Sequence, residues 1–346
     1  MPQHMFLLSP IIFPWDLAIV LMMATGLCIV ITSIVWFMRQ HTIAYPAKPL
    51  TIAMVMGRSG VGFFGFLGFF GFLLVTYGSF IEPQIIVVTR YTVPFPAQEP
   101  LKIAVISDMH IGPYKNAAFL ERAVRTVNAQ LPDIIVVPGD FLYDEQTDIR
   151  SLAPLAKLRA PLGVFAVVGN HDAGHFLSVF IHPNTPYARR DRTDEVTAYL
   201  EERGITILRN TSHIITLIHG KIAIAGTDDV WSPSFSLQVA LHDVPADVPL
   251  ILITHNPDII LEDASHRAQL IVTGHTHGGQ IRLPFIGPVP PMPDRLGRAY
   301  DQGLFSVDSD TTLAITRGIG ETLARARLFA WPEVMMLELQ PLGTSL

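Results

Sequence analysis

The hydrophobic pattern of the chain begins with two long apolar runs. Residues 17–38 and 59–81 contain no charged residue, and each run reaches the roughly 20 residues that a helix needs to cross a bilayer. A cleaved signal peptide is the alternative for the first run, but no basic segment precedes this run and no small-residue cleavage site precedes Arg39. The pattern therefore predicts a membrane anchor over residues 1–81 that contains two transmembrane helices.

The glycines of the second run follow a strict spacing of three. Gly62, Gly65, Gly68 and Gly71 drift slowly around a helix and form an oblique groove that lets another helix approach closely. The partner is either the first helix or a second copy of the chain, so a helix-mediated homo-oligomer is one of the expectations. The alternative is a lipid-facing helix in which the glycines have no specific role.

Basic residues near the ends of the two runs predict the orientation. The loop between the runs contains Arg39, Lys48 and Arg58, whereas residues 1–16 contain no Lys or Arg and the 20 residues after the second run contain only Arg90. Loops rich in Lys and Arg stay in the cytoplasm. We therefore expect the large C-terminal part of the chain on the extracytoplasmic side.

Shorter apolar runs recur after a Pro-rich stretch, residues 82–100, which reads as a connector or an edge strand. The runs are rich in Ile and Val and alternate with segments of helical periodicity, such as 117–131 and 193–204. They cover residues 101–107, 133–139, 163–169, 249–254 and 268–274. Continuous apolar strands are buried on both faces, so we expect an α/β domain over residues 101–346 whose sheet is covered on both sides.

A residue that can bind metal follows each of these five runs. In chain order they are Asp108 and His110, Asp140, Asn170 with His171 and Asp172, His255, and His275 and His277. A His or Asp at the end of a single strand is usually a turn residue or a helix cap. Five such ends are a stronger pattern, because the carboxyl ends of strands in an open α/β sheet share one crevice.

The composition restricts the chemistry of this crevice. The only cysteine is Cys28, inside the first apolar run, so the domain has neither a disulfide nor a thiolate metal site. Oxygen and nitrogen ligands suit Mn²⁺ above all, with Zn²⁺ or Fe as alternatives. The ligands are too many for one tetrahedral ion and enough for two ions bridged by a carboxylate, an arrangement that promotes displacement at phosphorus.

Beyond residue 81 there are 21 basic and 29 acidic residues, which excludes a basic nucleic-acid-binding surface.

The motifs "DMH", "GD", "GNHD", a separate His and "GHTH" occur in an order that resembles the calcineurin-like metallophosphoesterase superfamily, over about residues 100–280. The later segments "GGQIRLPFIGP" and "TRGIG" resemble its membrane-associated bacterial branch. The resemblance implies an αββα sandwich of two mixed β-sheets behind the two transmembrane helices. It also implies the inner or plasma membrane of a bacterium as the location.

The resemblance further implies the roles of individual residues. It assigns one metal to Asp108, His110, Asp140 and His277. It assigns the other to Asp140 as the bridge, Asn170, His255 and His275, with a hydroxide between the two ions. His171 would contact the phosphoryl oxygen or protonate the leaving group, and Asp172 would orient the His171 ring.

Three further residues are candidate substrate contacts. Asp228 and Asp229 follow an apolar stretch in "GTDDV" and could point into the same crevice, although an ordinary turn explains them as well. Arg317 in "TRGIG" could meet a substrate phosphate, with a structural ion pair as the alternative.

Together these patterns predict a membrane-anchored two-metal phosphoesterase that cleaves a phosphodiester, phosphomonoester or pyrophosphate bond, on a lipid-linked or envelope substrate. A cytoplasmic domain would favour a nucleotide-linked lipid precursor. A catalytically silent membrane receptor or scaffold with the same fold is the alternative, but such proteins usually lose the bridging Asp or the His after Asn, and this chain has Asp140 and His171. The metal motifs of metallo-β-lactamase-like enzymes and amidohydrolases do not fit the sequence.

Overall fold

The structure is a computed structural model that describes residues 13–42, 52–175 and 190–343. The chain divides into two compact units. The first consists of the N-terminal helices to Glu82 with the short segment Leu323–Ala326, and the second comprises Pro83–Thr322 together with the rest of the C-terminal part. Lys48, one of the residues on which the orientation depends, lies outside the described residues.

Two long helices form the first unit. They are α1 (Phe13–Thr42) and α2 (Ile52–Thr76), and a π-helical turn, η2 (Tyr77–Ile81), continues α2. The segments Asp16–Arg39 and Gly60–Gln84 are each long and apolar enough to cross a membrane, and few of their side chains are buried. The chain therefore has the two helices that its apolar runs predict.

The α2 glycines separate into those that contact α1 and those that do not. A Cβ atom placed on Gly68 would lie 2.8 Å from the Cβ of Ile29, and one placed on Gly65 would lie 2.9 Å from Ser33. Gly62 and Gly71 have no atom within 4 Å of such a Cβ. Within the described residues, the glycine groove of α2 is thus occupied by α1 of the same chain.

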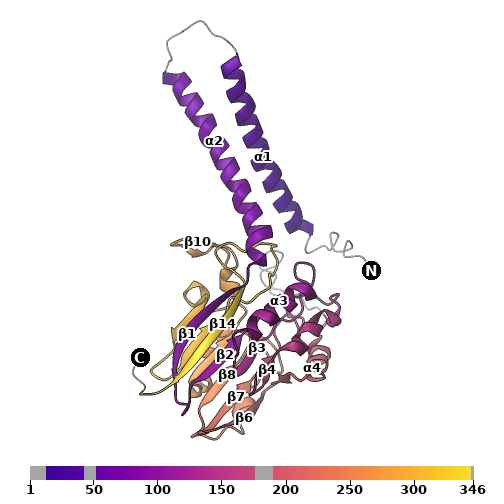
Figure 1. The fold of residues 1–346 in the computed structure, drawn as a ribbon, viewed down its shortest axis with the longest axis vertical. Coiled ribbons are helices and arrows are strands. Elements are labelled where there is room, and N and C mark those ends of the chain that lie inside the picture. The colour runs from indigo at the N-terminus through magenta and orange to yellow at the C-terminus, as the bar shows by residue number, and fades with distance from the viewer. Residues whose placement is uncertain (1–12, 43–51, 176–189, 344–346) are drawn as a thin grey trace. The chain divides into compact units, whose positions relative to one another are not determined.

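Two six-stranded mixed sheets form the body of the second unit (Figure 1). The first sheet has the order β1 (Val87–Phe95), β14 (Glu333–Pro341), β2 (Leu101–Val105), β3 (Ile134–Pro138), β4 (Val164–Val167) and β5 (Thr206–Ile207). Each pair of neighbouring strands in this sheet is parallel, except that β14 runs antiparallel to β2. The Pro-rich stretch after the helices therefore contains an edge strand, β1, which was one of its two predicted forms.

The second sheet has four neighbouring strands, β13, β9, β8 and β7, parallel to one another and an antiparallel strand at each edge. Its order is β12 (Gly303–Ser306), β13 (Thr312–Ile315), β9 (Leu270–Thr273), β8 (Leu250–Ile253), β7 (Gly220–Gly226) and β6 (Thr211–Leu217). A separate small hairpin consists of β10 (Arg282–Leu283) and β11 (Gly287–Pro288).

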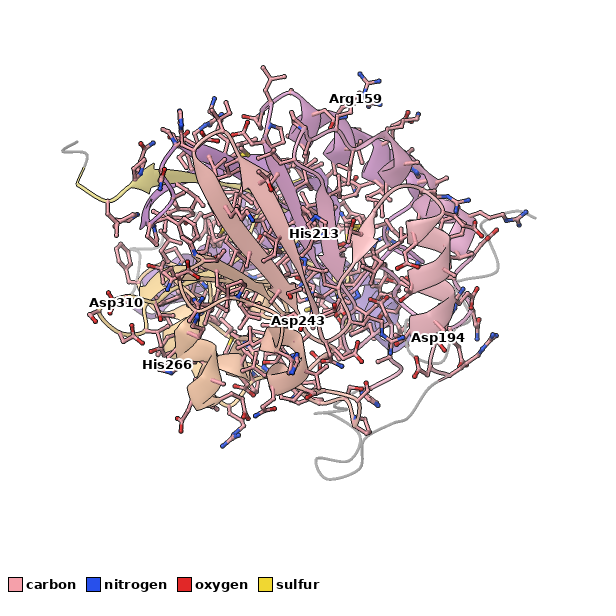
Figure 2. The ribbon with its side chains drawn as sticks, turned by 90° about the horizontal axis from the view of Figure 1, so that it is seen from below. Arg159, Asp194, His213, Asp243, His266 and Asp310 are labelled. Atoms are coloured by element: carbon pink, nitrogen blue, oxygen red, sulfur yellow. The ribbon has the colours of Figure 1, made fainter. Side chains whose placement is uncertain are left out.

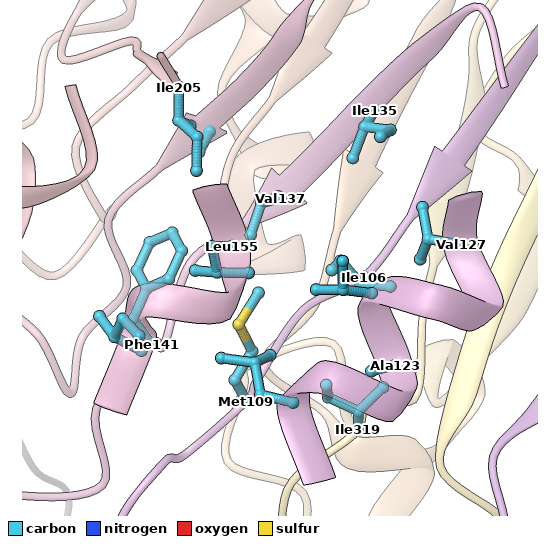
Figure 3. Close-up of a cluster of buried hydrophobic side chains, with 14 of the residues drawn as sticks. Ile106, Met109, Ala123, Val127, Ile135, Val137, Phe141, Leu155, Ile205 and Ile319 are labelled. Carbon is cyan, nitrogen blue, oxygen red and sulfur yellow. The ribbon is translucent and has the colours of Figure 1, made fainter. Parts of the chain in front are cut away.

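Three buried layers hold these elements together. Helix α3 (Ala117–Asn128), the 3₁₀ segment η4 (Ile149–Lys157) and α4 (Thr193–Glu201) cover the outer face of the first sheet, as Figure 3 shows for Val127, Leu155 and Val137. The middle layer packs the two sheets against each other. Helix α5 (Leu237–Leu241) and the 3₁₀ segments η5 (Pro257–Leu261) and η6 (Asp263–Arg267) cover the second sheet. The domain is an αββα sandwich, which confirms the predicted fold class.

The continuous apolar runs are explained by this layering. In β3, Ile135 and Val137 pack under the helices, while Ile134 and Val136 pack between the sheets, so both faces of the strand exclude water. In Figure 2 the exposed charged residues Arg159, Asp194 and Asp310 lie toward the edge of the domain.

Candidate metal centre

The predicted ligands gather where strands of the two sheets end. Three strands of the first sheet, β2, β3 and β4, lead into Asp108, Asp140 and Asn170. Strands β8 and β9 of the second sheet lead into His255 and His275. All five residues are buried, with side-chain exposures no higher than 6 %. The sandwich therefore brings together ligands that lie far apart in the sequence.

The backbone at these strand ends is bent into an unusual conformation. Asp108, His110, Asp140, His275 and His277 all have positive φ angles, between 41° and 69°. Residues with a Cβ rarely adopt this left-handed region, and such strain is concentrated at functional sites. Five of the seven predicted ligands thus share an uncommon backbone conformation.

Two glycines allow the chain to pass directly against the carboxylates. A Cβ atom on Gly169 would lie 2.1 Å from Oδ1 of Asp140, and one on Gly274 would lie 2.3 Å from Oδ2 of Asp108. No side chain fits at either distance. The glycines before Asn170 and before His275 are therefore required for the close approach of strand ends that builds the site.

One cluster of donor atoms contains Asp108, His110 and His277, whose potential ligand atoms all lie within 4.8 Å of one another. Nε2 of His110 is 3.1 Å from Nε2 of His277, and Nε2 of His277 is 3.6 Å from Oδ1 of Asp108. At these distances, the two imidazole nitrogens and the carboxylate are arranged as ligands of a common cation.

A second cluster is centred on His255. Its Nε2 atom lies 3.2 Å from Oδ2 of Asp140, 3.1 Å from Oδ1 of Asn170 and 3.2 Å from Nδ1 of His275. On the other side of the ring, Nδ1 lies 2.6 Å from the carbonyl of Pro138, to which it donates a hydrogen bond. Such a bond fixes the tautomer in which Nε2 of a neutral ring presents its lone pair to a metal.

Asp140 lies between the two clusters. Its Oδ2 atom is 3.2 Å from Nε2 of His255 and 3.4 Å from Nε2 of His110. Asp140 shares potential ligand positions with Asp108 and His255 as well as with His110 and His171. A carboxylate between two groups of candidate ligands lies where a two-metal site would have its bridging ligand.

The buried carboxylates and imidazoles of the site shift one another's pKa values. Burial and the charge of Asp140 raise the pKa of Asp108 to about 7. Burial opposes ionisation of Asp140 as well, but the neighbouring His255 and His171 lower the pKa of Asp140 below its usual value. Burial also favours the neutral ring of His255, yet the Asp140 carboxylate raises its pKa to about 10. The His255 ring and the Asp140 carboxylate therefore stabilise each other's charged forms.

The other imidazoles are already in the form that binds metal. Burial lowers the pKa of His110, His275 and His277 well below the usual value, so these rings are neutral, as metal ligands must be. Buried carboxylates, neutral imidazoles and one amide, without a thiolate, suit divalent metal ions. The residues present therefore fit the metals that the resemblance implies.

His171 lies at the edge of the centre, but its ring is not oriented as predicted. Its backbone N–H donates to Oδ1 of Asp140 at 2.9 Å, and its ring Nδ1 lies 3.1 Å from the carbonyl of Tyr143. The carboxylate of Asp172 instead accepts backbone N–H bonds from Gly169, Phe141 and Leu142. Asp172 thus holds the β3 and β4 loops together, and the expectation that it orients the His171 ring is wrong.

Two of the three candidate substrate contacts have structural partners. Asp228 pairs with Nε of Arg209 at 2.9 Å and accepts from the Ser234 hydroxyl at 2.6 Å. Arg317 donates from Nη2 to Oε1 of Glu333 at 2.9 Å, which is the ion pair that was its alternative interpretation. Both side chains therefore have partners within the protein, and their contact with a substrate stays a prediction.

Asp229 lies closer to the metal centre. It is fully buried, and burial raises its pKa to about 6, against the opposing influence of His255. Its Oδ1 atom accepts the backbone N–H of Trp231 at 2.9 Å. The indole of Trp231 stands edge-on to the His275 ring, with centroids 4.8 Å apart. Trp231 is a residue at the centre that sequence reasoning missed.

Arg327 is another residue that sequence reasoning missed. It is completely buried, and its Nη2 atom lies 3.3 Å from Nδ1 of His277 and donates to the carbonyls of Arg317 and Gly320. Its charge contributes to the low pKa of His277. Arg327 lies 50 residues after its His partner and follows no apolar run, so no local pattern could reveal it.

Comparison with known proteins identifies the group to which this arrangement belongs. Residues 101–279 match the family model described as calcineurin-like phosphoesterase. The uncharacterized metallophosphoesterase YkuE of Bacillus subtilis is 30 % identical over 272 residues, which cover 76 % of this chain and 89 % of that protein.

Two further relatives have names that state an activity. LpxG of Chlamydia trachomatis, named a UDP-2,3-diacylglucosamine pyrophosphatase, is 29 % identical over 303 residues, 75 % of this chain and 91 % of its own. YaeI of Escherichia coli, named a phosphodiesterase, is 30 % identical over 246 residues, 69 % of this chain and 82 % of its own. The resemblance inferred from the motifs is confirmed.

Proposed function

This chain belongs to the calcineurin-like phosphoesterase family and is a hydrolase of phosphoric ester or anhydride bonds, and we propose that it uses two divalent metal ions to cleave a lipid-linked phosphodiester or pyrophosphate at a membrane surface. The observation that carries the two-metal proposal is the position of Asp140, whose Oδ2 atom lies within 3.4 Å of one histidine from each donor cluster.

We propose the following ligands. Asp108, His110, Asp140 and His277 would hold one ion, and Asp140, Asn170, His255 and His275 would hold the other. Bound ions at such a site supply Lewis-acid polarisation of the phosphoryl group and an activated water. Mn²⁺ is the ion that we propose, because oxygen and imidazole ligands without thiolate suit it.

His171 is proposed to act on the substrate directly. Its ring is half-buried and stacks edge-on against His110, with centroids 4.3 Å apart. Nδ1 lies 3.1 Å from the carbonyl of Tyr143, and Nε2, which lies 3.4 Å from the Thr322 hydroxyl, is the nitrogen that we propose to contact a phosphoryl oxygen or to give a proton to the leaving group. The burial of the surrounding donors excludes water from the inner side of this ring.

The membrane part of the proposal depends on α1 and α2. If both cross the bilayer, the hydrolase domain is tethered at its surface, where phosphates of lipid-linked molecules are concentrated. LpxG carries a name that specifies a diacylated nucleotide pyrophosphate, which supports an amphiphilic substrate for this chain as well. The distribution of Lys and Arg still predicts an extracytoplasmic domain, and a reporter enzyme fused to the C-terminus that is active in only one compartment tests that orientation.

Metal titration of the full-length protein tests the two-metal proposal. The protein is purified in detergent, stripped of metal and assayed on bis-(p-nitrophenyl) phosphate while Mn²⁺ is added back stepwise. We expect activity to reach its plateau at two bound ions per chain, and Asp140→Ala to remove both the second ion and the activity. A plateau at one bound ion would contradict the proposal, and two bound ions without hydrolysis of any ester or pyrophosphate would favour the scaffold alternative.

A further inference from the structure

The small hairpin β10–β11 presents a continuous apolar surface to solvent. Four consecutive residues, Leu283–Pro284–Phe285–Ile286, are exposed, and Val289 follows just beyond β11. Ile286 is 65 % exposed and Phe285 is more exposed than in a reference peptide, at 109 %. Single exposed apolar residues are normal, but a group of them at one hairpin tip is typical of an interaction site.

The tip is held in a conformation that does not favour its residues. Phe285 has a φ of 67°, in the left-handed region that suits Gly, Asn and Asp and disfavours an aromatic residue. Neither burial nor backbone preference accounts for a Phe at this position. What remains to explain it is a contact made outside the domain.

The hairpin is attached rigidly to the metal centre. Arg282, at its base, donates to the carbonyl of Gly278 at 2.7 Å and pairs with Asp301 at 2.5 Å. The next glycine, Gly279, approaches β11 so closely that a Cβ would lie 2.3 Å from Cβ of Pro288. Gly278 and Gly279 directly follow the proposed ligand His277, so whatever holds the hairpin also positions this side of the site.

The charges near the tip favour an anionic surface. Between residues 283 and 300 the only acidic residue is Asp294, whereas Arg295 and Arg298 are both exposed. This balance is opposite to that of the chain as a whole, which has a net charge of −6. Nη2 of Arg298 donates to the carbonyl of Val289 at 3.1 Å, so this cation lies beside the exposed apolar residues. That combination binds at the interface of an anionic bilayer.

We propose that the β10–β11 hairpin inserts Leu283, Phe285 and Ile286 into the interface of the bilayer, and so holds the metal centre at the level of lipid phosphates. The inference rests on the membrane anchoring in the proposed function, since a chain with two helices long and apolar enough to span a membrane has a bilayer within reach of its domain. It adds a second, reversible attachment and restricts the substrate to a phosphate group close to the membrane surface.

The depth of single labels in full-length protein tests this insertion. In a Cys28→Ser background, Phe285→Cys is labelled with an environment-sensitive fluorophore, and the protein is reconstituted into vesicles of phosphatidylglycerol and phosphatidylcholine with or without brominated acyl chains. Ile218→Cys is the matched control, because Ile218 is an apolar residue at another turn and is 85 % exposed. We expect brominated lipid to quench the label at 285 at least twofold and to leave the label at 218 unchanged.

A second labelled position keeps the test independent of changes at Phe285 itself. Ile286→Cys is labelled with and without Phe285→Asn, a substitution that suits the positive φ and is expected to preserve the fold. Quenching at 286 should fall by half or more in the double variant. Equal quenching at 285 and 218 would overturn the proposal, as would a label at 285 that is shielded from water but insensitive to brominated lipid, which would indicate a protein partner.

The same samples separate this inference from the proposed function. Hydrolysis of water-soluble bis-(p-nitrophenyl) phosphate reports on the metal centre without a bilayer. Active protein with an unquenched label at 285 would refute the hairpin insertion alone. Quenched but inactive protein would refute the proposed hydrolysis and leave the insertion standing.

Discussion

The backbone N–H of His275 donates to both carboxylate oxygens of Asp108, at 3.0 and 3.1 Å. The two residues end strands of different sheets, β9 and β2, and they are proposed ligands of different ions. These hydrogen bonds orient the Asp108 carboxylate, a proposed ligand of one ion, through the backbone of His275, a proposed ligand of the other. A substitution that moves one of the two strand ends should therefore displace ligands of both ions.

Replacement of Asp140 by Asn should remove the bridge while keeping its shape. We expect the metal content to fall from two ions per chain to one or fewer. Loss of a residue that only supports a metal ligand lowers activity by up to about 10²-fold. Because Asp140 is proposed as a ligand itself, the rate of diester hydrolysis should fall by more than this. Metal analysis and steady-state assays measure both. Asp243→Asn is the control, because the Asp243 side chain is 88 % exposed and pairs only with the neighbouring His242; a similar loss there would contradict a specific role for Asp140.

Substitution of His171 by Ala should separate catalysis from metal binding. Because we propose that His171 contacts substrate rather than metal, the variant should keep two ions and lose about 10²- to 10⁴-fold in rate, the usual contribution of a general acid or base. The loss should be smallest with p-nitrophenyl esters, since their leaving group needs little protonation. A variant that has lost an ion would show that His171 is a ligand instead.

Gly274→Ala should displace Asp108. The added Cβ would lie 2.3 Å from both Oδ2 of Asp108 and Oγ of Ser107, so the carboxylate must move away from the other donors. We expect weaker metal affinity and a loss of activity that higher Mn²⁺ concentrations partly restore. Titration of activity against free Mn²⁺ measures this; an unchanged titration curve would mean that the strand end adjusts without moving the ligand.

Lys115 should make the stability of the domain depend on pH. Burial lowers the pKa of Lys115 to about 8, although its partner Glu321, 3.2 Å away, favours the charged form. The unfolded chain, with a Lys pKa of about 10.4, binds more protons than the folded chain between these values, so stability rises as pH increases from about 8 to about 10.4, by about 3 kcal/mol at most. Below pH 8 both states are protonated and the contribution is constant.

The comparison that isolates this group is with Lys115→Met. Thermal unfolding midpoints of both proteins in detergent, measured from pH 7 to 10.5, should converge or cross as the wild-type protein gains stability relative to the variant. Parallel curves would show that Lys115 does not titrate in this range.

The two helices should depend on Gly68 but not on Gly71. A side chain at Gly68 meets Ile29 of α1, whereas one at Gly71 meets no atom within 4 Å. Gly68→Leu should therefore destabilise the helix pair by about 1–3 kcal/mol, the usual cost of overpacking, and Gly71→Leu should have little effect. Protease resistance of the N-terminal region in detergent provides the readout, and equal behaviour of the two variants would argue against the helix contact.

The sequence by itself determined the parts of this protein that depend on local pattern. Apolar runs such as 133–139 predict β3 because a strand buried on both faces has no polar position, and the residues that follow each run predict the ligands because parallel strands present their carboxyl ends together. The ligand types then limited the chemistry, since Asp, Asn and His without Cys select the metals and the reaction.

Only the tertiary structure decided which partners these residues have. Asp172 follows His171 in the sequence, yet it binds the backbone of three other residues because the β3 and β4 loops converge on it. β14, from the C-terminal end of the chain, lies between β1 and β2 in the first sheet. Arg327 contacts His277 although 50 residues separate them in the sequence. Hydrogen bonds and ion pairs depend on distances between atoms of remote segments, and no periodicity along the chain contains that information.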